Sequence, residues 1–193
     1  MQNNSSMKTF VIDLLKTRIP IFYYYHNYEH TLYVEDKALE IGRAEGCTEQ
    51  KMKLISTAAL WHDTGFTKTY LEHEEEGCNL AKQYLPEYGY SPDDVRKICG
   101  IIMATKIPQS PKNKLEEIVA DADLEYLGTP DAAIKAGHLF KEWRHMDPSL
   151  TREEWNKKQI AFLQSHHYFT HFCKETKEAA KISYLQSLLD KIQ

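Results

Sequence analysis

Residues 58–66, AALWHDTGF, end an apolar helical run with an imidazole and a carboxylate side by side, at His62 and Asp63. Imidazole nitrogen and carboxylate oxygen are ligands for divalent metal ions, and both groups can also transfer protons. A single His-Asp pair is common, and His62 alone could cap the carbonyl groups at its helix end. The chemistry therefore depends on whether other residues of these types reach the same point.

Two further histidines, His26 and His30, lie four residues apart in YYYHNYEHTLYV, residues 23–34. On a helix they project from one face, which continues through Val34 and Ala38 and is therefore expected to be buried. A buried imidazole without a partner costs about 1–3 kcal/mol, so it needs a hydrogen bond or a metal ion. For His26 a tyrosine hydroxyl nearby could supply that bond.

A third candidate segment is EEIVADADLEYLG, residues 116–128, which carries two aspartates on an apolar helical pattern. Asp121 is in step with Ile118 and Asp123 is in step with Val119, so periodicity alone does not choose between them. A buried carboxylate needs a cation, a hydrogen-bond donor or a proton, and a lysine could meet that need for Asp121.

Two imidazoles and two carboxylates, from His30, His62, Asp63 and Asp121, make a mixed nitrogen and oxygen set. Such a set suits one divalent ion with open coordination positions. Each residue alone has an ordinary structural explanation, but four on or beside apolar helical stripes favour a shared metal site.

The segments that must position these residues are helix-length, separated by glycine and proline, with almost no strand signal. Thr48, Ser91 and Thr151 are predicted helix caps, the last within a capping box completed by Glu154. We predict an all-α bundle of about eight or nine helices, near residues 7–18, 28–45, 48–62, 70–85, 92–105, 113–127, 130–145, 152–165 and 172–192.

The composition is that of a globular chain, with 193 residues, 42% hydrophobic and 27% charged, and a formal charge of −4. No basic field favours nucleic acid or membrane surfaces, and no apolar run approaches the ~20 residues of a membrane span. The four cysteines are scattered and form no CxxC pair, and the N-terminal segment lacks signal-peptide features. We therefore expect one cytoplasmic domain over 1–193; the oligomeric state is not predicted.

The ordered pattern H…HD…D on consecutive helices resembles the HD-domain superfamily of metal-dependent phosphohydrolases. The matching segments are YHNYEH (25–30), LWHDTGF (60–66), HEEEGCNLA (73–81) and IVADADLEYLG (118–128). The resemblance implies an HD-type core over about 20–130, with the C-terminal helices of 130–193 packed on it. It also implies one divalent ion (Mn, Mg, Co, Ni, Fe or Zn) held by His30, His62, Asp63 and, from the apolar-Ala-Asp pattern, Asp121.

A two-metal subgroup of this superfamily carries a third histidine followed four residues later by glycine, and His73 with Gly77 is similar to that pattern. The subgroup's fourth histidine would fall near Thr105, which is not a histidine. We therefore expect a single ion, and the iron-dependent oxygenase branch is disfavoured.

The resulting expectation is a metal-dependent phosphoric ester hydrolase that cleaves a small phosphate ester, such as a nucleotide, by attack of a metal-bound water. Asp63 would position and deprotonate that water, and His73 or Glu74 would protonate the leaving oxygen. His26 and Lys106 are candidate phosphate contacts, although either could equally be a surface residue, which the usual exposure of lysine favours for Lys106. The alternative is a non-catalytic metal- or nucleotide-binding sensor or scaffold.

The C-terminal third holds further histidines and aromatic residues. SHHYFTHF, residues 165–172, includes His166, His167 and His171, and we expect a helix junction that lines or closes the pocket rather than a second metal site. Four aromatic residues are expected to pack the C-terminal helices onto the core and not to form a nucleobase platform. They are Trp143, Trp155, Phe162 and Phe169.

Overall fold

The computed structural model describes residues 2–191, and this part of the chain is helical, without a β-strand, as the all-α prediction requires. The ten α-helices among these residues are α1 Gln2–Arg18, α2 Tyr28–Ala44, α3 Glu49–Trp61, α4 His73–Tyr84, α5 Pro92–Met103, α6 Lys114–Leu124, α7 Ala132–Met146, α8 Arg152–Ser165, α9 His171–Thr176 and α10 Glu178–Leu189. Three 3₁₀ turns join them, η1 Thr64–Thr67, η2 Leu85–Tyr88 and η3 Glu125–Gly128. Within 2–191 no helix combines the length and the apolar character that crossing a bilayer would need.

Helix starts follow the predicted caps. The Thr48 side chain accepts a hydrogen bond from the backbone N–H of Lys51. Ser91 and Thr151 each form a complete capping box at the start of α5 and α8. Because these side chains satisfy N–H groups that have no partner inside the helix, the caps fix where the chain turns.

Three predicted segments end or break differently. Segment 70–85 becomes helical only at α4, because Glu72 has a φ of 57° in the left-handed region. Segment 113–127 changes to the 3₁₀ turn η3 after α6. Segment 172–192 is divided into α9 and α10 at Lys177, whose φ of −118° interrupts the helical path. This division brings the helix number to ten.

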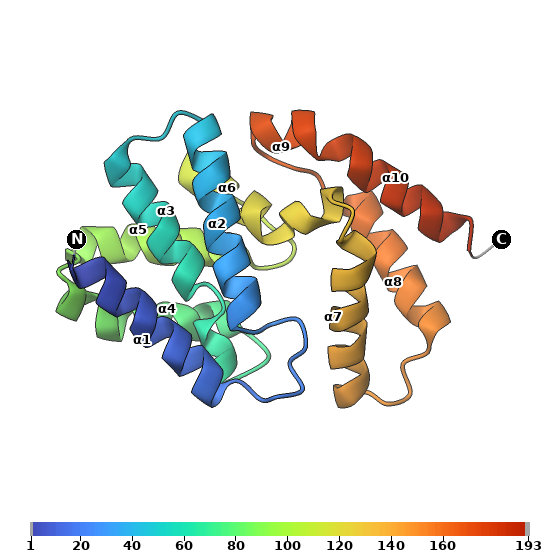
Figure 1. Cartoon of the computed structure of the whole chain (residues 1–193), viewed down its shortest axis with the longest axis horizontal. Coiled ribbons are helices and arrows are strands. Elements are labelled where there is room, and N and C mark those ends of the chain that lie inside the picture. Colours follow the sequence, from blue (N-terminus) through green and yellow to red (C-terminus); the bar gives the residue numbers. More distant parts are fainter. Residues whose placement is uncertain (1, 192–193) are drawn as a thin grey trace.

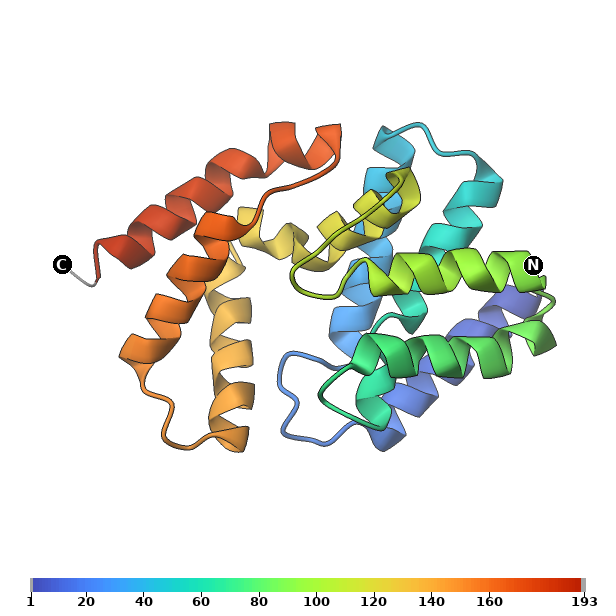
Figure 2. The same cartoon turned by 180° about the vertical axis from the view of Figure 1, so that it is seen from behind.

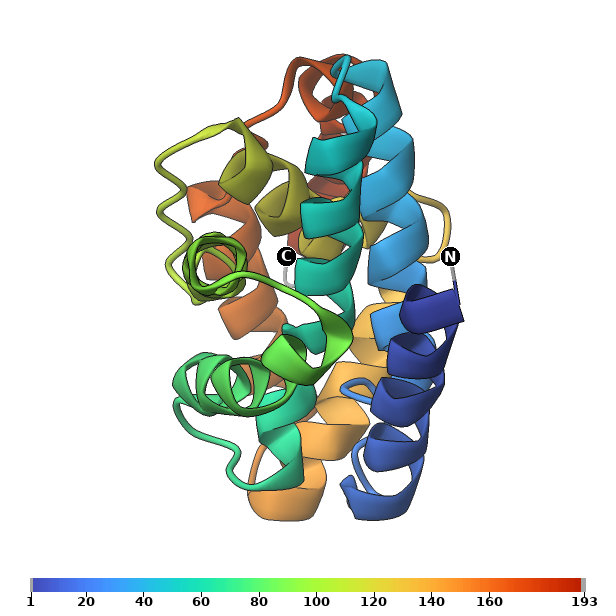
Figure 3. The same ribbon diagram turned by 90° about the vertical axis from the view of Figure 1, so that its left-hand side faces the viewer.

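The first six helices surround one apolar core (Figures 1 and 2). α2 and α3 run side by side and α6 packs against both, while α4 and α5 lie across them and are seen nearly end-on in Figure 3. The predicted buried stripe of α2 is confirmed, since Val34 and Ala38 are fully buried together with Ile55 and Trp61 of α3. The ends of α2, α3 and α6 are thereby held at one place.

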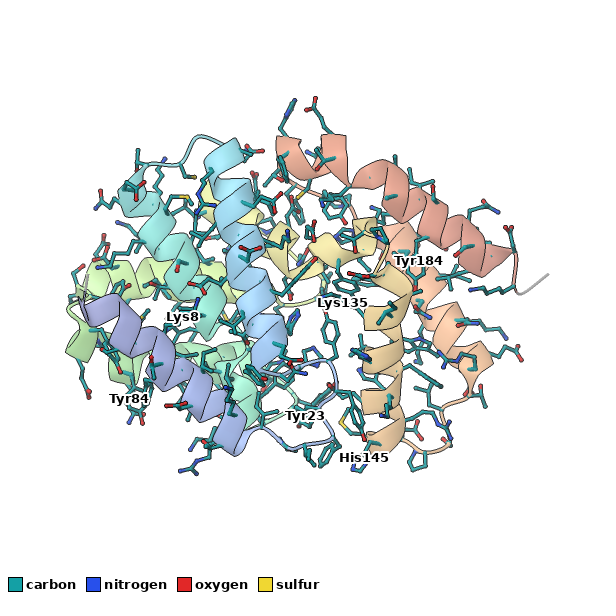
Figure 4. All side chains as sticks on the ribbon, in the orientation of Figure 1. Lys8, Tyr23, Tyr84, Lys135, His145 and Tyr184 are labelled. Atoms are coloured by element: carbon teal, nitrogen blue, oxygen red, sulfur yellow. The ribbon has the colours of Figure 1, made fainter. Side chains whose placement is uncertain are left out.

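The last four helices lie beside this core, with α7, α8 and α10 forming the opposite side of the molecule (Figure 1). A second apolar cluster joins the two sides and includes Tyr25, Leu124, Leu127, Ile160, Leu163 and Leu188. The loop of residues 19–27 reaches across to α7, where the ring of Phe22 stacks on His145 with centroids 3.9 Å apart. Figure 4 shows Tyr23 of this loop close to His145 at the end of α7, and Tyr184 on α10 beside α8. The loop and the second cluster thus connect the C-terminal helices to the core.

Candidate metal centre

His62 follows the last residue of α3, and its ring is fixed by the end of that helix. Nδ1 lies 2.7 Å from the carbonyl oxygen of Ala59. Because a carbonyl only accepts, Nδ1 carries the hydrogen and Nε2 presents a lone pair unless the ring is doubly protonated. His30, in the first turn of α2, is buried as well, and the Asn27 side chain caps this turn.

Asp63 and Asp123 bring carboxylates to these two rings. Oδ2 of Asp63 lies 3.2 Å from Nε2 of His62 and 3.5 Å from Nε2 of His30. Oδ1 of Asp123 lies 3.0 Å from Nε2 of His30 and 3.6 Å from Nε2 of His62. One ligand atom each from His30, His62 and Asp123 fall within 4.8 Å of one another, which is a spacing that one ion can bridge.

The electrostatics of this cluster favour a positive charge at its centre. Burial lowers the pKa of His62, but the carboxylates of Asp63 and Asp123 outweigh it and hold that pKa well above its usual value. Burial raises the pKa of both carboxyl groups, but the imidazoles outweigh it and hold each pKa well below the usual range. For His30 burial prevails, and its pKa is lowered. Either a proton on His62 or a bound cation would balance the negative charge of the two carboxylates.

Two buried atoms of the cluster lack partners that a bound cation would supply. Nε2 of His62 and Oδ2 of Asp63 have no hydrogen-bond partner among residues 2–191, although they lie only 3.2 Å apart. Leaving a buried polar atom unpaired costs about 1–3 kcal/mol, and a shared ion would act on both atoms at once. A set of two imidazoles and two carboxylates is a donor set for divalent transition metals. The residues present therefore fit a metal ion.

The choice of Asp121 as the fourth ligand was wrong. Its carboxylate accepts hydrogen bonds from the backbone N–H of Phe169 at 2.9 Å and from the N–H and hydroxyl of Thr170 at 2.8 and 2.6 Å. Asp121 is fully buried, as expected, but it faces the start of α9. Two residues on α6 turn the side chain by about 200°, so Asp123 and not Asp121 joins the histidines.

His73 and Glu74, at the start of α4, lie next to the cluster. Nε2 of His73 is 3.6 Å from Oδ1 of Asp63 and 3.5 Å from Oε1 of Glu74. The His73 ring stacks on Phe66 with centroids 3.7 Å apart. Burial lowers the pKa of His73 and favours its neutral form. The structure thus places His73 next to Asp63, and Glu74 next to His73.

His26 is held by a residue that sequence reasoning missed. Glu142, on α7, is fully buried, and its Oε1 lies 2.5 Å from Nδ1 of His26. Its Oε2 accepts hydrogen bonds from the backbone N–H groups of Tyr25 and His26 at 2.9 and 3.1 Å. Burial lowers the pKa of His26, but Glu142 outweighs it and the net shift is upward. The available sequence signal was that Glu142 is in step with Leu139 on a helix otherwise packed by apolar residues.

Lys106 and Thr105 lie at the end of α5, near the same site. Lys106 forms an ion pair with Glu75, so it is not an unpaired cation aimed at the cluster. The hydroxyl of Thr105 donates to the carbonyl of Ile102 at 2.8 Å. Among the described residues, no histidine occupies the position where a two-metal site would need one.

The C-terminal histidines lie elsewhere. Nδ1 of His166 is 3.3 Å from the buried Nζ of Lys181, His167 is exposed, and His171 pairs with Glu175 at 3.2 Å. The helix junction was predicted correctly, but these histidines do not line the pocket that contains Asp63 and Asp123. His166, His167 and His171 are close in the sequence but do not meet in space, because the chain between α8 and α9 is not helical.

A cavity of about 530 Å³ opens beside the histidine–aspartate cluster and continues between the C-terminal helices. His26, Asp63, His73, Glu74 and Asp123 lie along one part of its wall. Trp143, Trp155 and Phe162 pack the C-terminal helices, as expected, and they also line another part of this wall. Phe169 is absent from this wall, in agreement with that expectation.

Comparison with known proteins agrees with this geometry. The family model of the HD domain matches residues 27–125, just over half of the chain, and this span carries the whole histidine–aspartate cluster. A search of curated proteins found no significant match. A predicted HD superfamily hydrolase from an uncultured Thermotogales bacterium has a similar crystal structure, with a TM-score of 0.60, 19% identity and coverage of 96% of this chain and 92% of that one. Bacillus subtilis YpgQ, solved in complex with ADP, is similar with a TM-score of 0.64, 20% identity and coverage of 98% and 95%. The chain belongs to the HD domain family.

Proposed function

We propose that the protein is a metal-dependent hydrolase of a small phosphate ester, with one divalent ion held by His30, His62, Asp63 and Asp123. The observation that carries the proposal is the convergence of His30, His62 and Asp123, with Asp63 next to both histidines. The unpartnered Nε2 of His62 and Oδ2 of Asp63 support it. When bound, the ion would supply Lewis-acid stabilisation of a phosphoryl oxygen and acidify a water molecule.

The protein's own residues would orient the reactants around this ion. Asp63 stays ionised, since its pKa is held low, and its carboxylate would accept a hydrogen bond from the attacking water. His73 is the proton acceptor next to Asp63, because burial favours its neutral form.

The proton donor is better assigned to His26 than to His73. Glu142 raises the pKa of His26, so the ring can hold a proton on Nε2 while Nδ1–H is donated to the carboxylate. A protonated imidazole at the wall of the pocket could also contact the phosphate. Glu74 and Lys106 line the same cavity and are retained as candidate contacts of the leaving group and the phosphate.

Nucleotides are the first substrates to test, because YpgQ, which shares the fold, was solved with ADP. The experiment is metal analysis of the purified protein, followed by phosphate release from nucleotides and sugar phosphates with Mn, Mg, Co, Ni, Fe or Zn. His62→Ala and Asp63→Ala should each lose the metal and at least about 100-fold in kcat/KM. His138→Ala, which changes an exposed histidine on α7, is the matched control and should behave like the original protein.

Undiminished hydrolysis in both site variants would refute the proposal. Tight binding of metal and nucleotide without phosphate release under any of these metals would instead support the sensor or scaffold alternative.

A further inference from the structure

The cavity at the metal cluster is much longer than a phosphate group requires. Its volume of about 530 Å³ is in the range of pockets that hold whole small molecules. From Asp63 and Asp123 it passes the turn η3 and continues to α7, α8 and α10. A substrate whose phosphate lies at the metal cluster would therefore place the rest of the molecule against the C-terminal helices.

This distal part of the cavity is lined mainly by apolar and aromatic side chains. Trp143 of α7 meets Trp155 of α8 edge to face, with ring centroids 5.5 Å apart, and Trp143 is only half-buried. The other apolar residues of this wall include Leu124, Leu127, Leu139, Phe162 and Leu163. Flat aromatic faces of this kind hold a ring by stacking and by burial of apolar area.

The polar side chains in the same region are mostly occupied by one another. Oε1 of Gln159 accepts a hydrogen bond from the hydroxyl of Tyr184 at 2.8 Å, and its Nε2 donates to Asn156 at 3.3 Å. The indole N–H of Trp155 is a buried donor without a partner in the described part of the chain. Lys158 is exposed. This wall offers too few free hydrogen-bonding side chains to pair with the several donors and acceptors on the edge of a nucleobase.

We propose that the substrate carries a flat aromatic body on its phosphate, and that the C-terminal helices recognise this body by stacking and not by its hydrogen-bonding edge. The inference rests on the proposed function for the position of the phosphate. It predicts that aryl phosphates and nucleotides with different bases are accepted to a similar extent. Esters that lack an aromatic ring, such as ribose 5-phosphate, are poor ligands.

Binding of stable phosphonates tests the inference without requiring turnover. Calorimetric titration of the metal-loaded protein would compare methylphosphonate, phenylphosphonate and 1-naphthylphosphonate, which share the anionic group and differ in the body. Stacking of a base on an aromatic side chain typically changes affinity by roughly 5- to 150-fold. We therefore expect 1-naphthylphosphonate to bind at least about 10-fold more tightly than methylphosphonate.

Trp143→Ala should reduce this preference to less than about threefold while leaving the affinity for methylphosphonate unchanged, and Trp143→Phe should retain most of it. Ile134→Ala removes a 59% exposed apolar residue of the same helix that does not line the cavity, and both affinities should be unaffected. Equal affinities for the three phosphonates, or a preference of about 100-fold for one nucleobase over the others, would overturn the inference. If aromatic phosphonates bind as expected and no ester is hydrolysed, the proposed function fails and the aromatic site stands. If esters are hydrolysed without a preference for aromatic ligands, the proposed function stands and the aromatic site fails.

Discussion

The most decisive perturbation is the same substitution made at two positions of α6, Asp121→Ala and Asp123→Ala. The carboxylates are two residues apart and both are largely withdrawn from solvent, yet they face different partners. Asp121 accepts hydrogen bonds from the start of α9, whereas Asp123 lies against His30 and His62. The first substitution should therefore affect folding and the second should affect metal binding.

Asp121→Ala should destabilise the fold, because the hydrogen-bond donors that face Asp121 would be left without an acceptor. The backbone N–H groups of Phe169 and Thr170 lose their acceptor, and each unpaired buried donor costs about 1–3 kcal/mol. Two effects make the net loss of stability smaller. Phe169 is only half-buried, so water can partly replace the lost acceptor. Burial also raises the pKa of Asp121, so removing the buried carboxylate recovers the cost of burying its charge. A net destabilisation of about 3 kcal/mol lowers the Tm of a chain of this size by roughly 6–12 °C.

The assay combines thermal unfolding in the presence of chelator with metal content after reconstitution. Asp121→Ala should lose stability in chelator and retain the metal of the original protein. Asp123→Ala should show a smaller change in chelator and at least about 10- to 100-fold weaker metal binding, since even residues that only support a ligand cost that much. Equal loss of metal in the two variants, or full metal retention in Asp123→Ala, would refute the assignment of the fourth ligand.

Three further outcomes are expected. Glu142→Gln should lower kcat/KM by about 10- to 100-fold without loss of metal, because the neutral amide no longer stabilises a protonated His26. A pH–rate profile identical to that of the original protein would contradict this role of Glu142. Burial and the neighbouring Lys181 lower the pKa of His166 to about 3. Between pH 6.5 and pH 3 this histidine is therefore protonated in the unfolded chain and neutral in the folded one. The free energy of unfolding should fall as the pH drops through this window, by as much as about 4–5 kcal/mol. Urea titrations of the protein and of His166→Gln measure this, and an equal acid sensitivity of the two would exclude it. Chelation should lower the Tm and readdition of the metal should restore it, because metal at a free concentration of 100 times Kd adds about 2.7 kcal/mol to the free energy of unfolding. A Tm that does not respond to metal would count against the site.

Most of the helical framework could be predicted because it depends on local signals. Capping residues such as Ser91 and Thr151 satisfy their own helix starts, so the information lies within a few residues of the boundary. The breaks at Glu72 and Lys177 were missed because neither residue is a proline or glycine, the residues that mark such breaks in a sequence.

The site was predictable only as far as helical spacing specifies a face. His30, His62 and Asp63 lie close together, as the hypothesis of a shared site expects. Asp121 and Asp123, however, both lie on inward sides of α6, and burial does not say which neighbour a side chain meets. The preference for Asp121 came from a motif, and the start of α9, some 50 residues later in the sequence, decided otherwise. Glu142 was beyond reach for the same reason, since 116 residues separate it from His26.

These long-range contacts give the C-terminal helices a direct part in the site. The region matched by the family model ends at residue 125, but the orientation of His26 depends on Glu142 and the partners of Asp121 come from the segment before α9. The four proposed metal ligands lie on α2, at the end of α3 and on α6, all within the N-terminal core. Glu142, which raises the pKa of His26, lies on α7, and the aromatic wall proposed to hold the body of the substrate comes from α7 and α8. If the proposed function holds, changes in the C-terminal helices are therefore expected to alter which ester is cleaved without changing the four proposed metal ligands.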